Sequence, residues 1–188
     1  MVIPIYSCFH PVLRKKTSEV TEVNDDLKKL VENMFETMYK ADGIGLAANQ
    51  VGQDKSLIVI DINASKEKHK NEPPITMINP VIELYSENDV EYEEGCLSIP
   101  KFYEKVMRPE IIQIKYFDLD MKEHKVETNN LLSRVMQHEV DHLNGIIFTE
   151  RLSALNRTLA KSKLKKIQKG QVVPDYPYID SNGKLLTK

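Results

Sequence analysis

The segment GIGLAANQ at residues 43–50 restricts the possible fold more than any other part of the sequence. It matches G-x-G-x-x-A, the pattern of loops that bind a dinucleotide pyrophosphate, and such a loop must follow a strand and open a helix. Here a helical pattern precedes the segment and a strand pattern follows it. We therefore interpret the dinucleotide match as accidental. The two glycines are expected to let the backbone bend or let another segment approach closely.

The spacing of apolar residues predicts the elements around this segment. Before it, apolar residues recur every three to four positions, as in a helix that packs on a core, and Asn24 is a good N-cap. Runs that are rich in β-branched residues or alternate with polar ones predict strands, and Pro80 indicates an edge or a break in one of them. We expect helices at 25–41, 130–143 and 153–169, strands at 56–62, 75–84 and 89–95, and a hairpin formed by 111–118 and 122–128.

Length, charge and cysteine content narrow the class of protein. A chain of 188 residues fits one domain, and we expect residues 1–170 to form it and 171–188 to be an irregular tail. A net charge of −2 gives no overall attraction to nucleic acid, and no apolar run is long enough to span a bilayer, so we expect neither DNA nor a membrane as a partner. The N-terminus lacks a signal-peptide pattern and two cysteines cannot form a disulfide framework, which predicts a cytoplasmic, reduced protein.

A candidate metal site lies in QHEVDHLNG, residues 137–145, which contains His138-Glu139-x-x-His142. On a helix, side chains four positions apart share a face, so both imidazoles can bind one ion. Glu139 lies beside the first ligand, where a carboxylate can act on a water molecule. The alternative is a polar helix that carries two histidines without a metal. We favour the metal site.

A catalytic metal site needs a third protein ligand and an open position for water. Cys96 is favoured, because EGCLSIP places it between a strand and a proline, in a turn that can hold a thiol rigidly. We expect Cys8 to be a small buried residue and the other histidines to lie at the surface. A thiolate with two imidazoles suits iron(II), zinc, cobalt or nickel. The side chains that could supply the third ligand are acids, Cys96, Cys8, His10, His69 and His124.

Three segments of the sequence together resemble the three signature motifs of the peptide deformylases. In chain order they are GIGLAANQ, EGCLSIP and QHEVDHLNG. The resemblance extends over residues 3–150. It implies an α+β fold, with antiparallel or mixed sheets around a central metal-binding helix in a compact single domain that also has an N-terminal and a C-terminal helix. It implies removal of the N-formyl group from nascent polypeptides that begin with formylmethionine. It also implies one divalent ion per chain, Fe²⁺ in the cell and Zn²⁺, Ni²⁺ or Co²⁺ as alternatives in purified protein, held by Cys96, His138 and His142.

The same resemblance implies roles for residues around the ion. Glu139 would be the general acid and base, and the Gln50 side chain and the Leu97 backbone N–H would bind the oxyanion that develops. An extended peptide would lie against main-chain groups, and its methionine side chain needs an apolar pocket. Family members often carry an arginine shortly after the cysteine motif, where this chain reads Lys101-Phe102-Tyr103-Glu104, so no substrate contact is carried over there. The substrate-binding residues expected are Ile44, Gly45, Gly95, Leu131, Val135 and Tyr92.

Two other functions are compatible with the helix motif. A zincin-type metallopeptidase also uses H-E-x-x-H, and it would cleave peptides that carry no formyl group. A metal-stabilised module without enzymatic activity would need four protein ligands and no role for Glu139.

The helix expected at 153–169 combines an apolar arc with a basic one. Between Arg151 and Gly170 the sequence contains no acid. The basic arc is either a solvated face or a contact for ribosomal RNA near the exit of the nascent chain, because phosphate contacts need only a positive stripe. Leu152, Leu155, Leu159, Leu164 and Ile167 are expected to pack on the domain, and the basic residues are Arg157, Lys161, Lys165 and Lys169.

Overall fold

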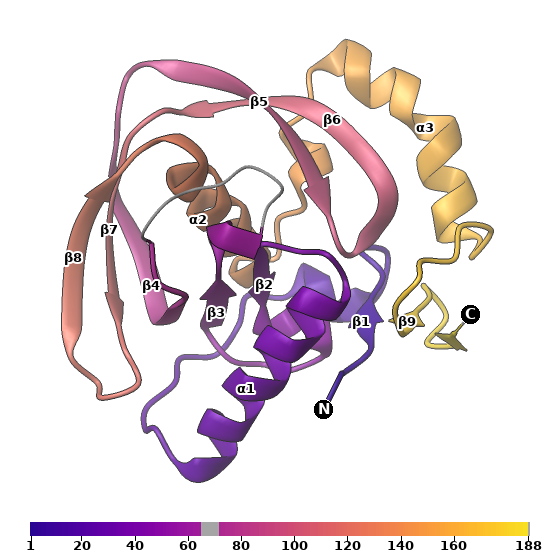
Figure 1. Cartoon of the computed structure of the whole chain (residues 1–188). Coiled ribbons are helices and arrows are strands. Elements are labelled where there is room, and N and C mark those ends of the chain that lie inside the picture. Colours follow the sequence, from indigo (N-terminus) through magenta and orange to yellow (C-terminus); the bar gives the residue numbers. More distant parts are fainter. Residues whose placement is uncertain (65–71, 188) are drawn as a thin grey trace.

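The structure, a computed structural model, describes residues 1–64 and 72–187. It has an α+β fold in which three helices pack among antiparallel and mixed sheets (Figure 1). The helices are α1 (Asp25–Lys40), α2 (Asn130–Leu143) and α3 (Ala154–Gln168), in agreement with the sequence prediction. The strands are β1 (Ile5–Tyr6), β2 (Gly45–Ala47), β3 (Leu57–Ile60), β4 (Ile75–Tyr85), β5 (Asp89–Cys96), β6 (Ile99–Pro109), β7 (Ile112–Phe117), β8 (Glu123–Thr128), β9 (Tyr178–Ile179) and β10 (Leu185–Leu186).

Helix α2 lies between two β-layers, which is what positions the site (Figure 1). One layer is a five-stranded antiparallel sheet in the order β2-β3-β4-β7-β8, and the other is the long hairpin β5-β6. Val135, Met136, Val140 and Leu143 of α2 pack on the sheet in one apolar cluster. The opposite side of α2 therefore faces the hairpin that carries Cys96.

Helix α1 forms for the local reasons that the sequence suggested. The Asn24 side chain accepts a hydrogen bond from the Leu27 N–H at 2.9 Å and so caps the helix. Leu27, Val31 and Met34 are buried at the expected spacing. The helix ends where the Gly43 N–H donates to the Met38 carbonyl, which delivers the chain into β2.

Besides β1 and the two strands of the tail, β2 and β6 were not predicted from the sequence, because their signal is weak or tertiary. β2 lies inside GIGLAANQ and pairs antiparallel with β3. β6 begins and ends near prolines, and its buried Arg108 breaks the apolar pattern of a strand. Pro80 lies within β4, where the register with β7 shifts between Ile78 and Val81, so the expected irregularity is a bulge.

The tail that follows α3 is more regular than we expected. β9 pairs in parallel with β1 and antiparallel with β10, so residues after Gly170 form a small three-stranded sheet with the N-terminus. Tyr178 of β9 is fully buried. The prediction of an irregular tail was therefore wrong for these strands, because a two-residue strand has no periodicity that a sequence can show.

The apolar arc expected on α3 is only partly correct. Leu152 and Ile167 are buried and Leu164 packs against the same cluster, whereas the exposed fractions of Leu155 and Leu159 are 67% and 70%. Leu159 and Leu164 are five positions apart, which is about 140° around a helix, so they cannot share one face. Ala160 supplies the buried contact instead.

Among the described residues, none of the helices combines the length and apolar character needed to cross a bilayer.

Candidate metal centre and active site

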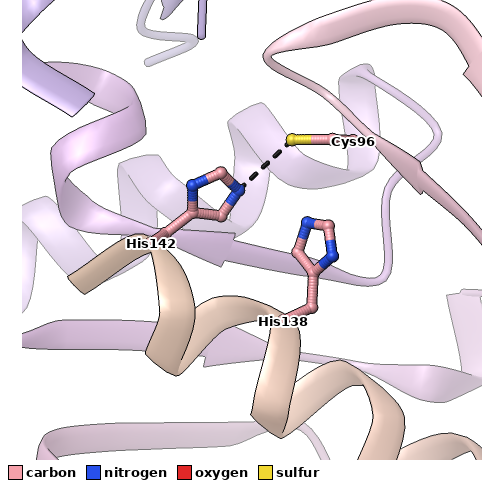
Figure 2. Close-up of side chains that lie close together, drawn as sticks. All are labelled: Cys96, His138 and His142. Atoms are coloured by element: carbon pink, nitrogen blue, oxygen red, sulfur yellow. Dashed lines mark hydrogen bonds between the residues drawn. The ribbon is translucent and has the colours of Figure 1, made fainter. Parts of the chain in front are cut away.

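Helix α2 and the end of β5 bring three potential metal ligands together, as the sequence predicted (Figure 2). His138 and His142 lie one turn apart on α2 and both are buried. The Cys96 Sγ lies 3.2 Å from the His142 Nε2. The donor atoms of the three residues are all within 4.8 Å of one another, which is close enough for one ion to contact them all.

The chemistry of this donor set fits a divalent transition metal. The Glu139 Oε2 beside the ligands is buried without a hydrogen-bond partner in the part of the chain that the structure describes, and so is the His142 Nδ1, the ring nitrogen that does not face Cys96. Unpaired buried polar atoms are rare and indicate an unseen ligand or a catalytic role. Burial, reinforced by His138, lowers the pKa of His142 well below its usual value, which keeps the imidazole in the neutral form that binds metal.

Glu94 orients the first histidine and was not predicted from the sequence. Its Oε2 lies 3.0 Å from the His138 Nδ1, and its Oε1 accepts from the Arg108 Nε at 2.7 Å and the Arg134 Nη1 at 2.9 Å. Burial alone would raise the pKa of Glu94, but the hydrogen bonds with His138 and Arg108 hold that pKa well below its usual range. The ionised carboxylate therefore fixes the tautomer and orientation of His138. The available signal was its position two residues before Cys96, on the same face of the strand.

Glu139 lies against the glycine segment, which explains one of the two glycines. A Cβ on Gly45 would lie 2.6 Å from the Glu139 Oε1 and 2.8 Å from the Val135 Cγ1, so only glycine lets β2 approach α2 this closely. Burial raises the pKa of Glu139 to about 7, although the neighbouring His138 works in the opposite direction. A carboxyl with such a pKa can both accept and return a proton near neutral pH.

The Gln50 side chain is held with its donor edge toward the Cys96 segment. Gln50 is in the short 3-10 helix Ala48–Val51 that follows β2. Its Oε1 accepts from the Ala47 N–H at 2.9 Å, and its Nε2 donates to the Ser98 Oγ at 3.2 Å and lies 3.7 Å from the Cys96 Sγ. Because the acceptor end is occupied by the backbone, the amide presents an N–H group at the centre.

Comparison with known proteins agrees with this geometry. The family model described as Polypeptide deformylase matches residues 2–158. The chain belongs to this family. It is 44% identical to the peptide deformylase of Salinibacter ruber over 185 residues, covering 95% of each chain, and 43% identical to that of Cellvibrio japonicus over 171 residues, covering 91% of this chain and 98% of the relative.

Solved structures of peptide deformylases have the same fold. A plant peptide deformylase superposes with a TM-score of 0.84 at 34% identity, covering 90% of both chains. The peptide deformylase of Legionella pneumophila gives 0.80 at 37% identity, covering 91% of this chain and 98% of that one. The α+β fold and the enzyme class that the motifs predicted are therefore confirmed.

In this peptide deformylase chain two of the three ligands, Cys96 and His138, and most of the expected substrate residues line one cavity of about 680 Å³, whereas His142 is not among the lining residues. Tyr92 is not among the lining residues, and its ring instead lies 5.1 Å from the Arg134 guanidinium. Tyr103, Pro174 and Tyr176 line the cavity without having been predicted, because strand β6 and the tail reach it only in the folded chain. The predicted residues that do line it are Ile44, Gly45, Gln50, Gly95, Cys96, Leu97, Leu131, Val135, His138 and Glu139.

The other residues considered as ligands lie elsewhere. Cys8 is buried in the cluster that joins β6 and α3, where burial raises the pKa of its thiol above the usual range. His10 caps a short helix by accepting from the Val12 N–H, and His124 lies 2.6 Å from an Asp118 carboxylate oxygen. His69 lies outside the described residues.

Proposed function

We propose that this chain removes the N-formyl group from the formylmethionine of newly synthesised polypeptides and releases formate. The observation that carries the proposal is that Cys96 and His138 line a single cavity with Glu139 and Gln50, while His142 completes the ligand cluster behind them, in a member of the deformylase family. Three protein ligands leave a coordination position open, as a catalytic site requires and a purely structural one does not.

The proposed mechanism assigns proton transfer to Glu139. A bound divalent ion would supply a Lewis acid and lower the pKa of a bound water toward neutrality. Glu139 accepts a proton from the attacking water, and later gives it to the amine that leaves. Its buried carboxyl with a raised pKa supports both steps. Glu94 meanwhile holds His138 in place through its Nδ1.

The charge that develops on the formyl oxygen needs donors that are fixed before the reaction. We propose the Gln50 Nε2 and the Leu97 backbone N–H for this role. Both residues line the cavity beside Cys96, and the Gln50 amide is already oriented by Ala47 and Ser98. Donors fixed in this way lose no reorganisation energy as the charge forms.

The peptide is proposed to bind as an added strand between two sheet edges. By strand order, β2 is at the edge of its sheet and β5 forms one side of a two-stranded hairpin, and both contribute to the cavity through Gly45 and Gly95. Ile44, Leu131 and Val135 supply an apolar wall near the metal ligands, which supports a pocket for the methionine side chain. We leave Tyr92 out of this pocket because of its position under Arg134.

One assay tests the reaction and the ion together. Formate release from formyl-Met-Ala-Ser is measured on anaerobically purified protein, with metal analysis on the same sample. We expect one ion per chain, iron(II) in the native state, and activity that peroxide destroys because the thiolate ligand and the iron are both oxidisable. Equal rates on formyl-Gly and formyl-Met peptides would contradict the methionine pocket, since each missing methylene costs about 1–3 kcal/mol in an apolar slot.

The same assay separates the proposal from a peptidase. A zincin-type enzyme would cleave Met-Ala-Ser without the formyl group and release no formate. Actinonin provides a second probe, because a peptide deformylase from Synechococcus elongatus, which superposes on this chain with a TM-score of 0.78, was crystallised in complex with it. We expect actinonin to compete with formyl-Met-Ala-Ser in this protein.

We further propose that the enzyme acts in the cytoplasm at the ribosome, with α3 as the contact. Lys161 and Lys165 are exposed on this helix and Lys169 is exposed at its C-cap, and positive side chains bind phosphate without sequence specificity. Arg157 is less suitable for such a contact, because its guanidinium donates to the Glu150 carbonyl at 2.7 Å. The expected contact is electrostatic and therefore weakens steeply with salt.

A charge-reversal experiment tests the ribosome contact. Changing Lys161, Lys165 and Lys169 to Glu is expected to abolish co-sedimentation with ribosomes while turnover of formyl-Met-Ala-Ser stays unchanged. The control reverses three lysines that are equally exposed outside α3, namely Lys16, Lys28 and Lys122. If the α3 variant still co-sediments at low salt, or the control loses binding equally, the basic face of α3 is only solvated surface.

A further inference from the structure

Two tyrosines of the C-terminal tail bind the segment that carries Cys96. The Tyr176 hydroxyl donates to the Leu97 carbonyl at 2.7 Å, and the Tyr178 hydroxyl donates to the Ser98 carbonyl at 3.0 Å. These are consecutive carbonyls in the turn between β5 and β6. The matched family region ends at residue 158, so both contacts come from beyond it.

The tail is anchored well enough to act as a fixed support for this turn. β9 pairs with β1 through Ile5–Tyr178 and Tyr6–Ile179, and β1 is followed by Cys8, whose N–H donates to the Ser98 carbonyl at 2.9 Å. Tyr178 is fully buried, and the rings of Tyr176 and Tyr178 meet edge to face at 6.4 Å. Figure 1 shows β9 beside β1, near the N- and C-termini.

The supported turn carries three groups that the proposed active site uses. Cys96 is a metal ligand, the Leu97 N–H is a proposed donor, and the Ser98 Oγ accepts from the Gln50 Nε2. A hydrogen bond to the Leu97 carbonyl fixes the peptide between Leu97 and Ser98, and therefore limits the torsions that aim the Leu97 N–H. The Leu97 side chain is held on its other side by Gly43, where a Cβ would lie 2.7 Å from the Leu97 Cδ1.

We propose that Tyr176 is a positioning residue for deformylation: its hydroxyl holds Leu97 so that the backbone N–H of that residue meets the developing oxyanion, and Tyr178 supports the same turn. This inference rests on the proposed function, and it makes residues 171–179 part of the active site. Tyr176 also lines the cavity, as Leu97 does, while its hydroxyl binds the turn.

The decisive variant is Tyr176→Phe, which keeps the ring and removes the hydrogen bond. With formyl-Met-Ala-Ser we expect kcat to fall about 10-fold, the equivalent of about 1.4 kcal/mol, while KM stays within about 2-fold. Tyr178→Phe should have a smaller effect, since the Ser98 carbonyl keeps its bond from Cys8. The matched control is Tyr39→Phe, which loses a hydroxyl bond of 2.8 Å to Asp61 outside this turn and should leave kcat unchanged.

Two measurements separate positioning from other roles. Metal content should be normal in Tyr176→Phe; loss of the ion would show that the tail supports Cys96 as a ligand and would overturn the inference. A kcat within about 2-fold of the parent, or an equal fall in Tyr39→Phe, would also overturn it. Hydrogen exchange of residues 95–100 should be faster in Tyr176→Phe than in the parent, and unchanged exchange contradicts the support itself.

The exchange readout also keeps the inference separate from the proposed function. If the parent releases no formate, the deformylation proposal fails, and faster exchange in Tyr176→Phe alone would still support the hydroxyl as the group that holds Leu97. If the parent is active and Tyr176→Phe is equally active, only the positioning role fails.

Discussion

Helices α2 and α3 are nearly equal in length, yet they place their charged residues in opposite environments. Every residue of α2 from Ser133 to Leu143 is buried, including Arg134, Glu139 and Asp141. In α3 the buried residues are Ala160 and Ile167, and its lysines are exposed. The difference is that the hairpin β5-β6 supplies partners for the charges of α2.

The partners form a continuous chain of charges along α2. Arg108 bridges Glu94 and Asp141 at 2.7 Å each, and Asp141 also accepts from Arg151 at 2.7 Å. Burying a charge without a partner costs several kcal/mol, so a helix with this composition is stable only against that hairpin. In α2, therefore, the charged residues are buried and fixed by ion pairs around the candidate site. In α3 the charged residues lie at the surface, where solvent or a partner can contact them.

The largest expected effect on activity comes from removing Cys96, the ligand that the hairpin β5-β6 contributes to the metal site. Cys96→Ala is expected to remove the ion and all measurable formate release, because two imidazoles alone bind a divalent ion weakly. Metal analysis and the formate assay on the same sample check this. A Cys8→Ala protein is the control, since it removes a neighbouring buried thiol that is not one of the three grouped ligands. Normal metal content in Cys96→Ala would refute the assigned ligand set.

The second-largest effect separates the catalytic role of Glu139 from its contribution to the stability of α2. Glu139→Gln is expected to fold and to keep its metal, but to lose turnover by a factor on the order of 10⁴, the upper range for a general acid and base. The shape of the residue is preserved, so a normal melting temperature is expected. Substantial residual turnover would mean that another group transfers the proton.

The charge network on α2 should respond far more strongly than the exposed charges on α3. Arg108→Ala removes the cation that joins two buried carboxylates, Glu94 and Asp141, and is expected to destabilise the fold by about 3–5 kcal/mol. Lys161→Ala, on the exposed face of α3, should change stability by no more than about 0.5 kcal/mol. Urea denaturation of both variants provides the measurement, and comparable losses would abolish the distinction between the two helices.

The fourth effect concerns the segment that packs between α2 and Cys96. Gln50→Ala is expected to lower kcat by about 10²–10³, the usual loss for one oxyanion donor, with little change in KM. A fall in substrate affinity at unchanged kcat would show that Gln50 binds only the ground state. Steady-state kinetics with formyl-Met-Ala-Ser distinguish the two results.

The smallest effect tests which face of α3 is packed. Replacing both Leu155 and Leu159 by Gln should alter the free energy of unfolding by less than about 0.5 kcal/mol, because both side chains are largely exposed. Ile167→Ala, on the buried face, should cost about 2–5 kcal/mol. A large loss of stability in the double variant would show that Leu155 and Leu159 pack on the domain, as the sequence predicted.

The sequence by itself determined the features that depend on neighbours along the chain. Helix α1 with its Asn24 cap, the ligand pair His138 and His142, and the reversed order around GIGLAANQ follow from spacings of a few residues. The three motifs in order were enough to identify the family and, through it, the third ligand. Reasoning from residue types alone had left Cys96 among several alternatives.

Only the tertiary structure decided which distant segments meet at the site. The contacts of Glu94 and Arg108 with α2, and of Tyr176 with Leu97, join residues that are between 33 and 79 positions apart. Side-chain periodicity reports which face of an element is buried, but it carries no information about what that face meets. The exposed leucines of α3 illustrate the same limit. Leu155 and Leu159 have the spacing of a buried helical face, but the face of α3 that packs on the domain carries Ala160 and Ile167.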